Sequence, residues 1–275
     1  MEITYDRWLP DGGAPVVAVL HVLHGWAEHA GRYERFARAC NEAGIAVYAD
    51  DHRGHGRTGL AAGGLGDLGP RGMDGVLDAC RAVSAEAFAA HPDAHRFLLG
   101  HSWGSFIAQR YLRRWGATLD GALLTGTTLR REGAVRRGGP NEAFEPAATP
   151  YDWLTRDAAE VQKYIDDPWC GFERMTASTS ATPARSTSET RSPDDADVPD
   201  DLPVLIFNGS DDPIGGDEGG RALASHYRSV AELVDVTFLS YAGGRHELFN
   251  ETNRDEVTAD VLAWLAERIS RPRRS

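Results

Sequence analysis

The chain has 275 residues, of which 41% are hydrophobic and 25% are charged, and its formal net charge is −12. This length and composition are typical of a globular protein that can bury one large core and still accommodate an insertion. The acidic balance argues against nucleic acid or an anionic membrane surface as a partner, because both carry negative charge themselves.

Short apolar stretches alternate with amphipathic ones along most of the chain. Strands are predicted over residues 3–9, as an edge strand, and over 16–23, 45–49, 97–99, 121–125, 204–208 and 234–240. Helices are predicted over residues 32–43, 74–90, 103–115 and 257–269. Short buried strands that alternate with helices predict an α/β protein with a doubly wound, mostly parallel sheet.

The alternation lapses between about residues 130 and 201, where only 152–165 reads as a helix. Residues 176–201 are rich in Ser, Thr, Pro and Asp, so they offer little apolar surface to offset the entropy lost on ordering. We expect that stretch to be mobile. The chain is therefore predicted to form a core from 1–128 and 202–275, with a lid or cap inserted at 129–201.

The cysteines and the first residues bear on the compartment. Cys40, Cys80 and Cys170 are odd in number and far apart, so they predict neither a disulfide framework nor a metal site. The N-terminus lacks the basic and then apolar regions of a signal peptide, and no apolar run approaches the length of a membrane span. We expect a cytoplasmic protein without an integral membrane span.

The run Gly100-His101-Ser102-Trp103-Gly104 lies between a predicted strand and a predicted helix. A G-x-S-x-G sequence in that context is typical of a nucleophile elbow, a turn so tight that the flanking positions require glycine. The turn exposes the serine hydroxyl and places the next N–H at a helix N-terminus, where it can stabilise an oxyanion. Ser102 is the predicted nucleophile, and alternation along the strand predicts that His101 points away from its hydroxyl.

A serine nucleophile needs a base, and the base needs an acid to orient it. His246 follows two glycines after the last predicted strand, so its loop can bend back over Ser102. Asp211 and Asp212 both follow the strand predicted over 204–208. Because neighbouring side chains on an extended segment point in opposite directions, we expect only one of them to face His246. We favour Asp212, and Asp211 is the alternative.

The second oxyanion donor is expected in the loop after an early strand, where His24-Gly25-Trp26 lies. Gly25 would let the backbone turn so that the N–H of Trp26 joins that of Trp103. The alternative is that His24-Gly25 is an ordinary turn that ends the strand and has no catalytic role.

Five blocks of the sequence carry a resemblance to a known family. They are residues 24–33, 51–58, 100–105, 209–213 and 243–251. In these blocks the chain resembles the serine α/β-hydrolases, specifically the monoacylglycerol lipase and lysophospholipase-like group often called serine aminopeptidase-like. The resemblance implies the α/β-hydrolase fold, no cofactor and no metal. It also implies Ser102 as nucleophile, His246 as base, Asp212 as acid, and oxyanion donors at Trp26 and Trp103.

Two features depart from that group. Trp103 stands where methionine is usual, and residues 176–201 look unlike the helical cap of such enzymes. Residues 51–56, Asp-His-Arg-Gly-His-Gly, have the composition of a metal or acid–base site, but the resemblance favours a structural loop. Aromatic residues could line an apolar acyl pocket or simply pack in the cap and core. The candidates for substrate binding are Trp153, Trp169 and Phe172.

These observations predict a cofactor-independent serine hydrolase that cleaves carboxylic esters through an acyl-enzyme. The expected partner is a small acyl ester: a monoacylglycerol, a lysophospholipid or a smaller soluble ester. The alternatives are a non-catalytic ligand-binding protein on the same scaffold, and a peptidase or cofactor-free peroxidase that uses the same triad. Serine at the elbow excludes an epoxide hydrolase or a dehalogenase, which would place aspartate there.

Overall fold

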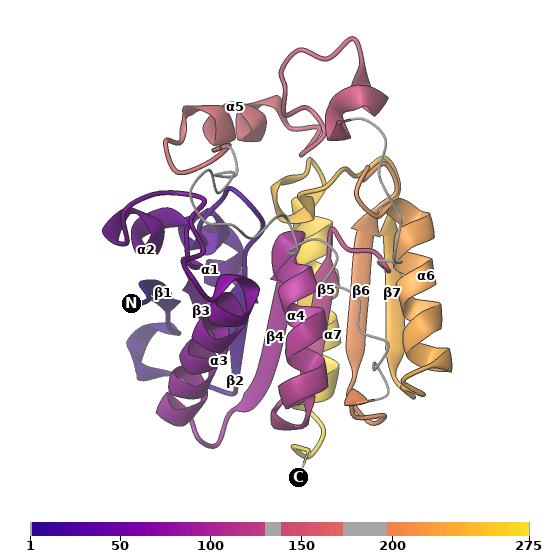
Figure 1. Cartoon of the computed structure of the whole chain (residues 1–275). Helices are drawn as coiled ribbons and strands as arrows, with labels where there is room; N and C mark the ends of the chain where they lie inside the picture. The colour runs from indigo at the N-terminus through magenta and orange to yellow at the C-terminus, as the bar shows by residue number, and fades with distance from the viewer. Residues whose placement is uncertain (1, 130–138, 173–196, 275) are drawn as a thin grey trace.

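The computed structural model describes residues 2–129, 139–172 and 197–274. Its centre is a seven-stranded sheet with the order β1-β3-β2-β4-β5-β6-β7 (Figure 1). The strands are β1 (Tyr5–Trp8), β2 (Ala18–Leu23), β3 (Ile45–Asp50), β4 (His95–His101), β5 (Gly121–Thr125), β6 (Val204–Gly209) and β7 (Val236–Tyr241). Among the strands of the described residues, β1 alone pairs antiparallel, with β3, and the other pairs are parallel. The sheet is therefore mostly parallel, as predicted.

Helices cover both faces of the sheet, and each face has its own core. One core packs α3 (Gly72–Ala90), α4 (Trp103–Trp115) and α6 (Gly216–Ser229) against the sheet, and the other packs α1 (Glu34–Glu42) and α7 (Arg254–Ile269). Every residue of β2, β3, β5 and β6 is buried. Strands covered on both faces are read in the sequence as continuous apolar runs, which is why they were recognisable. The doubly wound α/β architecture is confirmed.

Two helices outside these predictions are informative. The short α2 (Gly56–Ala61) follows β3, and α6 follows β6. Helix α6 contains Gly219 and Gly220, which weaken its helical pattern in the sequence. A Cβ at Gly220 would lie 2.3 Å from the Phe238 ring. Close packing of this helix on β7 therefore explains the glycine that hid the helix.

The described part of the cap, residues 139–172, lies above one end of the sheet (Figure 1). Its helix α5 spans Ala158–Asp166, so the predicted start at residue 152 was wrong. The Asp157 carboxylate caps the helix by accepting the N–H groups of Ala159 and Glu160, which fixes the N-terminus there. The division at 128 and 201 stays a prediction.

Most of the stretch predicted to be mobile lies outside the described residues. Its last residues, 197–201, are described, and Val198 is buried in the first core. Within the described ranges, no helix combines the length and the apolar character that crossing a membrane would require.

Candidate active site

Ser102 lies on the turn between β4 and α4 in a strained backbone conformation. Its φ is 53° and its ψ −120°, a region that residues with a side chain rarely occupy. A Cβ at Gly100 would lie 2.5 Å from the carbonyl oxygen of Gly104, and one at Gly104 would lie 2.0 Å from that of Leu23. Both flanking glycines are therefore required by close backbone contacts, as the motif predicts.

His246 and Asp212 form a buried hydrogen-bonded pair in the loops after β7 and β6. His246 Nδ1 lies 2.9 Å from Asp212 Oδ1, and the side chains are 2% and 0% exposed. Asp211 is exposed and accepts a hydrogen bond from Ser210 instead. The structure thus brings Asp212, and not Asp211, to His246.

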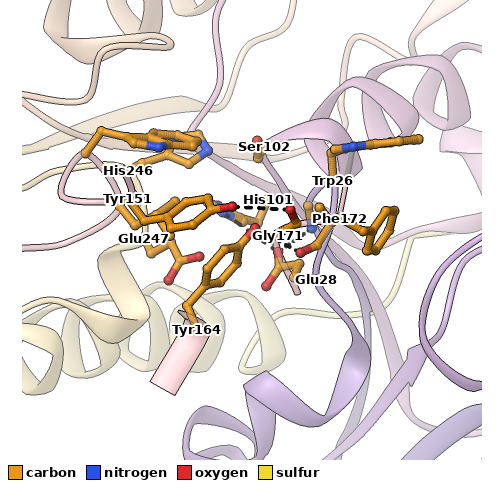
Figure 2. A pocket seen from close by; sticks show the side chains of 14 residues that line it. Trp26, Glu28, His101, Ser102, Tyr151, Tyr164, Gly171, Phe172, His246 and Glu247 are labelled. Atoms are coloured by element: carbon orange, nitrogen blue, oxygen red, sulfur yellow. Dashed lines mark hydrogen bonds and ion pairs between the residues drawn. The ribbon is translucent and has the colours of Figure 1, made fainter. Parts of the chain in front are cut away.

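The second nitrogen of the His246 ring, Nε2, does not bind Asp212. His246 Nε2 is buried and has no hydrogen-bond partner among the described residues. His246 and Ser102 line the same cavity, of about 210 Å³ (Figure 2). Ser102 and His246 thus meet at this cavity, and Asp212, from a third loop, is linked to it through its hydrogen bond with His246.

The loop after β2 packs directly against the nucleophile elbow. A Cβ at Gly25 would lie 3.2 Å from Ser102 Cβ, so the chain passes the serine too closely for a larger residue. Trp26 follows at once, and its ring contacts the Trp103 ring edge-to-face at a centroid distance of 5.1 Å. Trp103 is the first residue of α4, where backbone N–H groups have no acceptor within the helix. The two predicted oxyanion donors thus belong to neighbouring residues beside Ser102.

The His101 ring lies at the site, and that it points away from the Ser102 hydroxyl stays a prediction. Its ring lies 4.7 Å from the His246 ring, between centroids, and lines the same cavity as Ser102. Burial, with a smaller effect of His246, lowers the pKa of His101 to about 4, so this imidazole is neutral near pH 7.

The cavity has a polar part and an aromatic part. Apart from Ser102 and His246, the polar part contains Glu28, His101, Tyr151, Tyr164 and Glu247 (Figure 2). Trp153 and Phe172 also line it, as proposed from the sequence. Trp169 is not among the described lining residues, and its ring contacts His29 edge-to-face at 5.2 Å instead.

Hydrogen bonds and a ring contact join the cap to the loop that carries His246. The Glu247 N–H donates to the carbonyl oxygen of Leu154 over 2.7 Å, and the His246 N–H to that of Trp153 over 3.4 Å. The Trp153 ring also lies 4.7 Å from the His246 ring. Trp153 therefore covers the imidazole in addition to lining the cavity.

A buried cluster below the site includes a histidine of the 51–56 loop. Asp50, His52 and Cys80 have the composition of a metal site, and their ligand atoms lie within 4.8 Å of one another. However, His52 Nδ1 faces Asp50 Oδ2 at 2.7 Å and His52 Nε2 faces the His24 carbonyl oxygen at 3.2 Å. Both ring nitrogens thus lie within hydrogen-bond distance of oxygen atoms of the protein, which already engage them in this loop. The geometry supports a structural loop.

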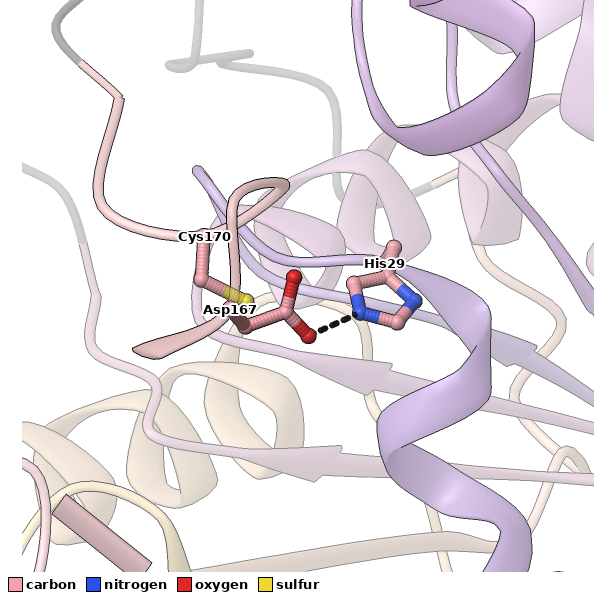
Figure 3. A group of neighbouring side chains, drawn as sticks. All are labelled: His29, Asp167 and Cys170. Carbon is pink, nitrogen blue, oxygen red and sulfur yellow. Dashed lines mark hydrogen bonds and ion pairs between the residues drawn. The ribbon is translucent and has the colours of Figure 1, made fainter. Parts of the chain in front are cut away.

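A second cluster of metal-ligand types joins the cap to the loop after β2. It contains His29, Asp167 and Cys170 (Figure 3). His29 Nδ1 accepts the Gly31 N–H over 3.2 Å, so the hydrogen of a neutral ring is on Nε2, which faces Asp167 Oδ2 at 2.8 Å. This histidine is therefore occupied as a hydrogen-bonding link between cap and core.

A family model described as serine aminopeptidase, S33, matches residues 14–253 of the chain. The chain belongs to this family. A monoacylglycerol lipase of Mycolicibacterium smegmatis is 30% identical, over 98% of this chain and 94% of the relative. A non-heme haloperoxidase of Rhodococcus erythropolis is 27% identical, over 96% of each chain.

Among solved structures, a thermostable carboxyl esterase from Bacillus coagulans, in complex with glycerol, superposes with a TM-score of 0.80 and 26% identity. The superposition covers 97% of this chain and 94% of the esterase. The α/β-hydrolase fold and the monoacylglycerol lipase-like group of the family, both predicted from the five sequence blocks, are confirmed.

Proposed function

We propose that the protein is a serine hydrolase that cleaves carboxylic esters through an acyl-enzyme. The observation that carries the proposal is the buried Asp212–His246 pair at the cavity that Ser102 lines from its strained turn. Membership of the family and the likeness to a monoacylglycerol lipase and a carboxyl esterase support it.

The geometry suggests a role for each group. His246 donates its Nδ1 hydrogen to Asp212, which leaves the Nε2 lone pair to take the proton of the Ser102 hydroxyl. The serine oxygen attacks the ester carbonyl, and the N–H groups of Trp26 and Trp103 stabilise the oxyanion. The alcohol leaves with the proton from His246, and water repeats the sequence on the acyl-enzyme.

The cavity suggests the kind of ester. Carboxylates, tyrosine hydroxyls and a neutral histidine lie beside the serine, so a leaving alcohol with further hydroxyl groups would find hydrogen-bond partners there. A monoacylglycerol has such an alcohol, and so do other small acyl esters of polyols. The monoacylglycerol lipase relative supports the first of these.

A cofactor-free peroxidase is the second candidate, and the haloperoxidase relative at 27% identity favours it. It would use the same three residues. Oxidation of bromide by hydrogen peroxide, assayed beside ester hydrolysis, separates the two activities.

The decisive experiment compares Ser102→Ala with the wild type on a p-nitrophenyl ester. Turnover is expected to fall on the order of 10⁶-fold, because the variant lacks the nucleophile. Labelling by a fluorophosphonate probe should be lost as well, whereas Ser210→Ala, in the neighbouring loop, should keep both. An active, labelled Ser102→Ala variant would overturn the proposal. A wild type that the probe does not label would favour a non-catalytic binding protein.

A further inference from the structure

Three charged side chains form a largely buried ion cluster beside the cavity, and none of them has a part in the chemical steps proposed above. In this ion cluster the Arg32 guanidinium binds both oxygens of Glu247, at 2.6 Å each, and one oxygen of Glu28, at 2.8 Å. The side chains of Glu28 and Glu247 are 4% and 6% exposed. The Arg32 guanidinium also lies 4.8 Å from the centre of the Tyr164 ring, in the cap. Figure 2 shows both carboxylates at the cavity, opposite Ser102.

One end of the ion cluster holds the loop after β2. The second oxygen of Glu28 accepts the N–H of Gly25 and the hydroxyl of Tyr33, the latter over 3.0 Å. Gly25 packs against Ser102 in this loop, and Trp26 follows it. The Glu28 carboxylate therefore fixes the backbone that presents a proposed oxyanion donor.

The other end holds the loop after β7. Glu247 directly follows His246, and its second oxygen also accepts the side-chain amide of Asn250 over 3.0 Å. Burial opposes ionisation of Glu247, but the Arg32 guanidinium outweighs it and lowers the pKa of this carboxyl to about 2. Arg32 thus joins the loop of the proposed oxyanion donor to the loop of the proposed base, across 215 sequence positions.

Arg32 joins the two loops, and its positive charge also affects the electrostatic surroundings of His246. The charged and titratable groups that face the imidazole, or lie one residue beyond it, are Asp212, His101, Glu247, Arg245 and Glu28. The Arg245 guanidinium turns away and donates to backbone carbonyl oxygens of the cap. Of the two arginines, Arg245 and Arg32, it is therefore Arg32 whose positive charge compensates the carboxylates of Glu28 and Glu247.

We propose that Arg32 is a positioning residue of the active site, which sets the separation of the two loops and limits the negative charge beside His246. The inference rests on the proposed function, because it assigns Arg32 an effect on Ser102 chemistry. Without Arg32, the two carboxylates would repel each other and the loops would shift. The uncompensated negative charge would also favour the protonated form of His246, which cannot act as the base.

The test compares Arg32→Met, Arg32→Lys and Glu247→Gln with the wild type on p-nitrophenyl acetate over a range of pH. Arg32→Met should lower kcat by about 10²-fold, with little change in KM, because misplacement of catalytic groups acts on the chemical step. The acid limb of kcat/KM should move up by about one pH unit. Glu247→Gln removes one negative charge, so its acid limb should move down. Arg32→Lys should recover the wild-type limb, because it keeps the charge.

Arg268→Met is the matched control. The Arg268 side chain is 6% exposed and binds both oxygens of Asp235, at 2.8 and 3.0 Å, between α7 and the start of β7. Its loss should lower stability without moving the acid limb. If Arg32→Met does not fold, Glu247→Gln still tests the downward shift of the limb, and Arg32→Lys tests whether keeping the positive charge keeps the wild-type limb.

The inference has a readout apart from activity. In protein with ¹³C-labelled histidine, NMR gives the titration of His246 directly, with His246→Asn to assign its signal. A wild type without Ser102-dependent hydrolysis would refute the proposed function, while the NMR shift between variants would still decide the charge effect. Arg32 variants whose limb and His246 titration match those of Arg268→Met would overturn the inference. So would shifts of the same sign in Arg32→Met and Glu247→Gln.

Discussion

Asp211 and Asp212 have the same type of side chain and lie in the same loop, but Asp212 is buried and Asp211 is exposed. Asp212 Oδ1 accepts hydrogen bonds from His246 and from the N–H of Ile214, inside the protein. Asp211 is in solvent. A carboxylate that receives the imidazole N–H fixes which nitrogen of the ring carries the lone pair, so the two positions should respond very differently to the same change.

Asp212→Asn is therefore expected to lower kcat by about 10⁴-fold, because an amide in this place favours the wrong tautomer of His246. Asp211→Asn has the same size and the same loss of charge, and it should leave kcat within about 2-fold of the wild type. Both are measured on the p-nitrophenyl ester at pH 7 to 8. A greater loss at position 211 than at 212 would assign the acid to the other aspartate.

From the sequence, the acid of the proposed triad could be narrowed to Asp211 and Asp212. The ion cluster around Arg32 could not be predicted. Glu28 and Arg32 lie in the first resemblance block and Glu247 in the last, but nothing in either block indicates that they pair. Contacts between residues 215 positions apart come from the sheet topology and not from local pattern.

At the scale of elements, one very tight contact lies where α4 leaves the sheet. Gly104, the second residue of α4, lies against the end of β2, and a Cβ there would be 2.0 Å from the carbonyl oxygen of Leu23 and 2.5 Å from that of His24. Both obstacles are backbone atoms of a central strand and its loop. Neither can move without disturbing the register of β2 with β4.

Gly104→Ala should therefore destabilise the protein by about 3 kcal/mol or more, at the upper end of overpacking effects. Denaturant unfolding measures this directly. Gly139→Ala is the matched control, since a Cβ there meets nothing within 4 Å and its φ is −77°. Equal stability of the two variants would contradict the contact between α4 and β2.

The elements themselves were predictable to different degrees for physical reasons. The range of α4 was predicted to the residue, because an apolar stripe begins directly after the elbow. Helix α6 was missed, because close approach to β7 replaced the expected apolar side chains with glycine. The start of α5 was misplaced, because aromatic residues of the cap before Asp157 continue the apolar spacing without being helical.

At the scale of the molecule, the site follows from parallel topology. Trp26, Ser102, Asp212 and His246 come after β2, β4, β6 and β7, whose neighbours in the sheet run parallel. Parallel strands place their carboxyl ends at one edge, so loops far apart in sequence meet there. This is why the convergence of the triad could be predicted once the strands were recognised.

The stability of the whole molecule should also decrease at low pH, because the fold buries histidine side chains in their neutral form. Burial lowers the pKa of His55 to about 3 and, with His246, that of His101 to about 4. Burial and two neighbouring histidines also lower the pKa of His24 well below its ordinary value. His55 Nε2 is buried without a hydrogen-bond partner among the described residues, so a proton there would be an unpaired buried charge.

These pKa values give the sign of the pH dependence. Well above pH 6.5, as at pH 8, the three histidines are neutral in both states and contribute no slope. As the pH falls below 6.5, the unfolded chain binds protons that the folded protein does not, so the free energy of unfolding decreases. Glu247, with its pKa lowered to about 2, loses its contribution only below about pH 4.5, so it does not affect the window from 6.5 to 5.

Within that window we expect each of these histidines to lower the free energy of unfolding by roughly 1 kcal/mol per pH unit. His55→Gln should make the slope shallower by one such contribution, since glutamine does not titrate. Denaturant unfolding at half-unit steps from pH 8 to 5 measures it. The difference between variant and wild type at pH 8, where the histidine is neutral in both states, isolates the packing effect of the substitution. An unchanged slope in the variant would mean that His55 takes up its proton in the folded protein as readily as in the unfolded chain.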